Sequence, residues 1–212
     1  MVPPFLVAMR KADRMRRIIY AIDQLSRTIG HAFAWCIVIL MIGTTYEVIV
    51  RYAFNAPTDW AFDFSYILYG GLFFMAGAYT LSRGGHVRAD MFSRNWPPRV
   101  QATVEIVLYV LFFFPGILAM VVAGYHYAHD SFRILEKSIN SPIGVPIWQI
   151  KLLIPVGAAL IAVQGLAEVM RAAICLREGR WPPRLHDVEE LEQQLMHDKK
   201  TQQEYAGKGD TP

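Results

Sequence analysis

Four long runs of apolar residues, separated by polar segments, dominate the pattern of the 212-residue chain. They cover residues 29–50, 60–81, 100–125 and 147–175, and the middle of each is nearly free of charge. An α-helix rises about 1.5 Å per residue, so about 20 residues cross the ~30 Å hydrocarbon core of a bilayer. Because lipid offers no hydrogen-bonding partners, the backbone groups of such a run must bond to one another, which favours a helix. The pattern predicts an all-α integral membrane protein with four transmembrane helices.

The segment before the first run, residues 1–27, has a weaker helical pattern. Met15, Ile18 and Ile22 follow helical spacing, and arginines occupy another face. This arrangement is typical of an amphipathic helix that lies on a membrane surface. We expect such a surface helix at the N-terminus, on the cytoplasmic side. Direct continuation into the first transmembrane helix is the alternative.

The remainder of the chain divides into two parts. A four-helix transmembrane domain is expected over residues 28–178. Residues 179–212 are polar and are expected to form a cytoplasmic tail that is partly disordered, since it has few apolar residues to bury. The first run is longer than the apolar region of a signal peptide and lacks a following small-residue cleavage site, so we expect it to be retained.

Charge supports a membrane protein and indicates its orientation. Hydrophobic residues make up 54% of the chain and charged residues 18%, below the roughly 25% of soluble domains. Fourteen cations flank the side that holds both termini: Arg10, Lys11, Arg14, Arg16, Arg17, Arg27, Arg83, Arg88, Arg94, Arg99, Arg171, Arg177, Arg180 and Arg184. Four flank the other side: Arg51, Arg133, Lys137 and Lys151. Since cytoplasmic segments carry the excess of Lys and Arg, both termini are predicted to be cytoplasmic, and the net charge of +3 indicates topology rather than a nucleic-acid partner.

The ionisable residues within the runs all fall near helix ends. They are Glu47, Asp63, Glu105, Lys151 and Glu168. A carrier usually places its polar site near the membrane midplane, on interrupted helices. The helix breaker Pro115-Gly116 has no acid beside it, so it predicts a kink rather than a binding site. We therefore expect no transport site, catalytic residue, cofactor or metal in this chain.

A stand-alone four-helix membrane protein, such as a haem-binding electron carrier, is the alternative function. Four-helix bundles hold haem between histidines on facing helices. His126 and His129 lie one turn apart at the end of the third run, without a second pair opposite. The two cysteines, Cys36 and Cys175, form no CxxC motif, so neither a disulfide nor thiol redox chemistry is expected.

Two connections carry more specific patterns. Between the first two runs the chain reads R-Y-x-F-N-x-P-x-x-W-x-x-D, from Arg51 to Asp63. After the second run it reads H-V-R-x-D, from His86 to Asp90. With the Gly- and Pro-containing segment at 144–165, these patterns resemble the small membrane subunit of tripartite ATP-independent periplasmic (TRAP) transporters, the DctQ-like family. Asp63 stands where that family more often has Glu.

The resemblance implies a role in transport. In that family a periplasmic binding protein captures an organic acid, and a large membrane subunit carries it inward, coupled to Na⁺. The small subunit packs against the large one as a scaffold. The resemblance thus implies a bacterial inner-membrane protein that is not an enzyme. Its partners would be the large subunit, transiently the binding protein, and the lipid bilayer.

Small residues in the third and fourth runs permit close helix packing. Ala119 and Ala123 lie in the third run, and Gly157, Ala158, Ala162 and Gly165 lie in the fourth. Small-residue faces let helix backbones approach closely within a membrane. Either the large subunit or the chain's own helices would use these faces.

The candidate assembly residues come from the two connection motifs. They are Arg51, Asn55, Trp60, Asp63, His86, Arg88 and Asp90. Two simpler interpretations compete: Asp63 is a first-turn acid favoured by the helix dipole, and the last three belong to an ordinary inner loop. We expect Arg51 and Asp63 to pair across the ends of the first two helices, because a carboxylate near the hydrocarbon edge needs a partner. Glu47, four residues before Arg51 on the same helical face, competes for the arginine.

Overall fold

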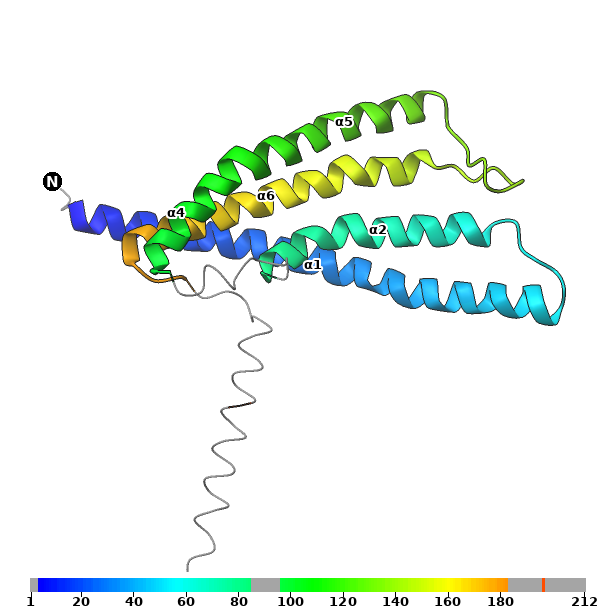
Figure 1. The fold of residues 1–212 in the computed structure, drawn as a ribbon, viewed down its shortest axis with the longest axis horizontal. Coiled ribbons are helices and arrows are strands. Elements are labelled where there is room, and N and C mark those ends of the chain that lie inside the picture. Colours follow the sequence, from blue (N-terminus) through cyan, green and yellow to red (C-terminus); the bar gives the residue numbers. More distant parts are fainter. Residues whose placement is uncertain (1–3, 85–95, 183–195, 197–212) are drawn as a thin grey trace, which may run out of the picture.

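The computed structural model describes residues 4–84, 96–182 and 196, and the regular secondary structure of these residues is helical apart from one isolated β-bridge. The helices are α1 (Pro4–Ala53), α2 (Ala61–Ser82), α4 (Pro98–Leu108), the π-helical turn η1 (Tyr109–Phe113), α5 (Phe114–Arg133) and α6 (Trp148–Glu178) (Figure 1). Four stretches are long and apolar enough to cross a membrane: α1, α2, α4 continued through α5, and α6. For the described residues, the prediction of an all-α protein with four helices long and apolar enough to span a membrane is confirmed.

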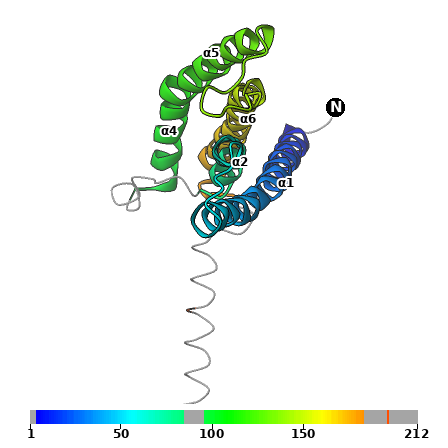
Figure 2. The same ribbon diagram turned by 90° about the vertical axis from the view of Figure 1, so that its right-hand side faces the viewer.

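Helix α6 occupies the centre of the arrangement. It packs against α1, α2, α4 and α5, whereas α1 and α5 lie on opposite sides of it (Figures 1 and 2). Close approach depends on small residues. A Cβ atom at Gly157 would lie 2.8 Å from the carbonyl oxygen of Phe74 in α2, and one at Gly165 would lie 2.3 Å from the ring of Phe113. These two glycines therefore pack the chain's own helices.

The small residues of the third span behave differently. Ala119 and Ala123 on α5 are both exposed, so they do not serve packing within the described part of the chain. The sequence left open whether the small-residue faces pack the chain's own helices or an outside partner, and the answer differs between α6 and α5. The face on α6 is internal, and the face on α5 is available to an outside partner or to lipid.

Helix α1 runs unbroken for 50 residues, about 75 Å, which is more than twice the ~30 Å hydrocarbon core. The expected separate surface helix is not seen; of the two alternatives, the structure favours continuation into the first span. The reason lies in packing. Ile19 is buried against Ala167 and Ile174 of α6, with Met15 and Ile22 beside them. The apolar face of this segment therefore contacts α6.

A π-helical turn interrupts the third span just before Pro115. Proline has no N–H group and its ring collides with the carbonyl of the preceding turn. Widening the turn relieves this conflict, and the Phe114 N–H bonds to the carbonyl oxygen of Tyr109 five residues earlier. The α4–α5 stretch curves along its length (Figure 1). The kink predicted at Pro115-Gly116 thus has an identifiable cause in the backbone.

Candidate functional site

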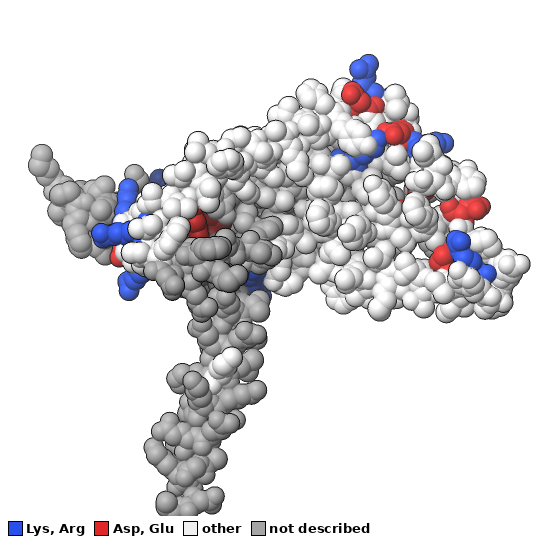
Figure 3. Space-filling view, in the orientation of Figure 1, with Lys and Arg blue, Asp and Glu red and all other residues white. Residues whose placement is uncertain are grey.

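Charged side chains gather at the two ends of the molecule, and the visible surface between them is largely uncharged (Figure 3). We call the end with the α1–α2 and α5–α6 connections the loop end, and the end with the beginning of α1 and the last turns of α6 the terminal end. On α6, no ionisable residue lies between Lys151 and Glu168. This separation corresponds to about 25 Å of helix.

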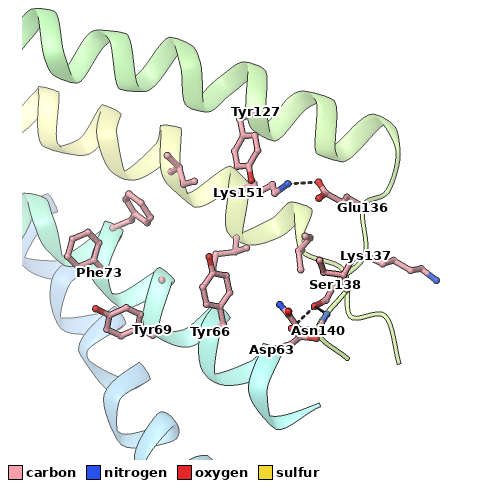
Figure 4. Close-up of a pocket in the computed structure, with 16 residues that line it drawn as sticks. Asp63, Tyr66, Tyr69, Phe73, Tyr127, Glu136, Lys137, Ser138, Asn140 and Lys151 are labelled. Atoms are coloured by element: carbon pink, nitrogen blue, oxygen red, sulfur yellow. Dashed lines mark hydrogen bonds and ion pairs between the residues drawn. The ribbon is translucent and has the colours of Figure 1, made fainter. Parts of the chain in front are cut away.

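At the loop end, Asp63 is the most deeply buried carboxylate, with 2% of its surface exposed. It accepts hydrogen bonds from the hydroxyls of Ser138 at 2.6 Å and Ser141 at 2.5 Å. Both serines belong to the α5–α6 connection, residues 134–147, called here the α5–α6 loop. A buried carboxylate without partners is costly, so these two bonds fasten the loop to the first turn of α2 (Figure 4).

The α5–α6 loop is also ordered by bonds within it and to α6. The Ser138 N–H donates to the carbonyl oxygen of Val145 at 2.8 Å, beside the β-bridge of Lys137 and Pro146. The Lys151 ammonium forms an ion pair with Glu136 and lies 4.1 Å from the centre of the Tyr127 ring. The hydrogen bond from Lys151 lowers the pKa of Glu136 below its ordinary value.

The predicted pair between Arg51 and Asp63 is wrong. Arg51 donates to Glu47 Oε1 from Nε at 3.0 Å and from a terminal nitrogen at 2.6 Å. The other oxygen of Glu47 accepts from the backbone N–H of Thr58 at 3.3 Å and from its hydroxyl. The competing partner therefore prevails, because it lies one turn away on the same helix. Asp63 faces α6 and the α5–α6 loop instead.

The other residues of the motif that runs from Arg51 to Asp63 shape the α1–α2 connection, residues 54–60. Asn55 has a φ of 52°, in the left-handed region that asparagine tolerates better than most residues. Trp60 immediately precedes α2, and its ring stacks on Tyr46 with centroids 6.4 Å apart. Arg51, Asn55 and Trp60 therefore lie together at this connection, while Asp63 belongs to a different cluster. His86, Arg88 and Asp90 lie outside the described residues.

The terminal end contains a buried network that the sequence patterns did not predict. Gln164 accepts from the Ser26 hydroxyl at 2.8 Å and donates to Asp23 at 2.9 Å. Arg171 forms ion pairs with Asp23 and Glu168. The exposed fractions of all five residues are 4% or less. The available signal was the helical spacing of Gln164, Glu168 and Arg171 within an otherwise apolar run.

This network ties the first half of α1 to the last turns of α6. Arg171 engages one acid on each helix, and all these groups are removed from water. A second ion pair, Arg16 to Glu178 at 2.7 Å, continues the tie closer to the end of α6. These side chains bond to one another and leave the buried Arg171 Nε without a partner; the network thus indicates a structural attachment rather than a ligand site.

A pocket of about 440 Å³ opens at the loop end between α2, α5, α6 and the α5–α6 loop. Tyr66, Tyr69 and Phe73 form its wall on α2, with Tyr127 and Lys151 on the opposite side (Figure 4). No group of three metal-ligating side chains occurs within the described residues. His129 lies on the exposed surface of α5, 3.6 Å from Asp130 and stacked on Tyr125.

The fold and the positions of these polar groups define a multi-spanning helical membrane protein whose described charged clusters lie at its two ends. A family model for the DctQ component of tripartite ATP-independent periplasmic transporters matches residues 40–175. The chain belongs to this family and is the small membrane component of a TRAP transporter, as its motifs had suggested. A search of curated proteins found no match. The family consists of transporter components rather than enzymes, and the match does not favour a haem-binding electron carrier.

Proposed function

We propose that this chain is the scaffold subunit of a TRAP-type secondary transporter in the bacterial inner membrane. It packs against the large, Na⁺-coupled membrane subunit, which moves an organic acid delivered by a periplasmic binding protein. In this proposal both termini are cytoplasmic and the loop end faces the periplasm, in keeping with the distribution of Lys and Arg.

The observation that carries the proposal is how the buried polar groups are used. Transport sites are usually built near the midplane from interrupted helices and polar groups that can bind an ion or substrate. Here Asp63 is held by two serines, and Arg171 is held by two acids. The long central stretch of α6 contributes no ionisable side chain. Such a chain is suited to holding another subunit.

The α1–α2 connection supports a role in assembly. Tyr52 and Phe54 are 81% and 72% exposed, beside the half-exposed guanidinium of Arg51. Aromatic side chains and arginine are enriched at protein interfaces. We propose this connection as part of the contact with the partner subunits, and we retain His86, Arg88 and Asp90 as candidates on the cytoplasmic side.

Reconstitution tests the division of labour. Liposomes that contain this chain alone should take up no organic acid under a Na⁺ gradient, whereas liposomes with the large subunit should do so once the binding protein is supplied. Gradient-driven uptake by the chain alone would rule out the scaffold role.

Labelling tests the orientation independently. A cysteine at Thr58 should react with a membrane-impermeant thiol reagent from outside intact cells, and a cysteine at Ser93 should not. The opposite pattern would invert the topology without affecting the family assignment.

A further inference from the structure

The pocket at the loop end changes in character with depth. Its rim carries charged and amide side chains, including Glu136, Asn140 and Lys151. Farther from the α5–α6 loop along α2 and α6 it is lined by Phe73, Phe74 and Ile154, and we call this its deeper part. The wall between rim and depth consists of Tyr66 and Tyr69, which combine an apolar ring with a hydroxyl (Figure 4). The pocket is therefore amphipathic along its axis, with its polar end where the helices end.

The length of the pocket matches one leaflet of a bilayer. Asp63 at its rim and Phe74 at its depth are separated by eleven residues of α2, which corresponds to about 16 Å along the helix axis. Half of a ~30 Å hydrocarbon core is about 15 Å. A chain that enters at the rim and follows α2 would end near the membrane midplane.

The charges at the rim are balanced. The ammonium of Lys151 and the carboxylate of Glu136 form an ion pair there, and the side chain of Glu136 remains 31% exposed. Asp63 is already covered by Ser138 and Ser141, and Lys137, which also lines the pocket, extends its ammonium outward from it (Figure 4). A rim with one cation beside one anion complements a headgroup that carries one charge of each sign.

The tyrosines offer donors at an intermediate depth. Tyr66 and Tyr69 are 58% and 59% exposed, and both line the pocket. In a bilayer, polar groups at this depth gain from a partner, because water is scarce. The ester oxygens of a glycerolipid lie between headgroup and acyl chain, and they can accept such bonds.

We propose that this pocket binds one glycerophospholipid with a zwitterionic ethanolamine headgroup. Its phosphate lies at Lys151, its ammonium at Glu136, its glycerol esters beside Tyr66 and Tyr69, and one acyl chain against Phe73. A volume of about 440 Å³ is in the range of small-ligand pockets, roughly 300–1,000 Å³. The proposal concerns the chain by itself and does not depend on which subunits it assembles with.

Native mass spectrometry of the full chain tests this proposal. The protein would be released from nanodiscs that contain equal amounts of phosphatidylethanolamine and phosphatidylcholine, and the lipids retained per chain would be counted. We expect one retained phosphatidylethanolamine, in several-fold excess over phosphatidylcholine. Phe73→Ala should reduce retention several-fold. Phe62→Ala is the matched control, because Phe62 is equally exposed on α2 but does not line the pocket.

A second variant examines the headgroup. Glu136→Gln removes the carboxylate that would bind the ammonium, so the chain should still retain a lipid but lose its preference for ethanolamine over choline. The proposed site would be wrong if the wild type and Phe73→Ala retained equal amounts of phosphatidylethanolamine. It would also be wrong if Phe73→Ala and Phe62→Ala lost equal amounts of the lipid. In the complex with the large subunit, the cysteine of Phe73→Cys could be cross-linked to that subunit. A cross-link to one of its helices would show that protein occupies the pocket and would overturn the proposal of a bound lipid.

Discussion

The two polar ends of this protein hold their helices together by different means. At the terminal end, a fully buried arginine is shared by acids on α1 and α6. At the loop end, a buried aspartate is capped by two neutral hydroxyls, and the accompanying ion pairs are partly exposed. A buried charge that loses its partner is far more costly than a neutral group that loses one. The terminal end should therefore be the more sensitive to single substitutions.

Arg171→Met should have the largest effect, because it leaves Asp23 and Glu168 buried without their cation. Removing one partner of a buried ion pair typically costs about 3–5 kcal/mol. Thermal unfolding of the purified chain in detergent measures the loss. Arg177→Met, on the exposed side of the same helix, is the control and should change little. Similar losses for both variants would remove the distinction between the two ends.

Asp63→Ala should have the next largest effect. It leaves the hydroxyls of Ser138 and Ser141 without their acceptor, which costs about 1–3 kcal/mol. The α5–α6 loop should also be cleaved faster by proteases, since its tie to α2 is lost. Asp59→Ala is the control, because Asp59 is exposed on the α1–α2 connection. If Asp59→Ala matched Asp63→Ala in both measurements, the serine tie would be unimportant.

Arg51→Ala should have a small effect that adds to that of Asp63→Ala. Arg51 is paired with Glu47 four residues away and is about half exposed, and exposed pairs of this spacing contribute little to stability. Residues without shared partners usually give additive losses. A double-mutant cycle on thermal stability measures this. A coupling well beyond experimental error would restore the pair that the sequence suggested.

The smallest effect concerns acid. The pKa of Glu136 is lowered by Lys151, so this ion pair stabilises the loop above the ordinary carboxyl pKa of about 4.3, and the stabilisation is lost as pH falls through the lowered value. Protease sensitivity of the α5–α6 loop should therefore rise on acidification below about pH 4. Glu136→Gln should already be sensitive at neutral pH and should respond less to acid. If acid raised the protease sensitivity of this variant as much as that of the wild type, the effect of acid would have to come from groups other than Glu136.

The locations of the charged residues were predictable, but their partners were only partly so. Glu47 and Arg51 are four residues apart on one helix, and helical geometry alone brings them together. Asp63 meets Ser138 and Ser141 more than seventy residues later. Nothing local in the sequence marks those serines, because hydroxyl groups are common in loops. The partners of Asp63 therefore had to be found in the structure.

The sequence by itself determined the number of helices long and apolar enough to span a membrane, the class of protein and the family. These depend on hydrophobic length and on local motifs, which require no knowledge of distant contacts. Only the tertiary structure decided that α1 continues without a break and packs on α6, that Arg171 joins the two, and that a pocket lies beside α2. These features arise from side chains far apart in sequence, whose meeting depends on how the helices cross.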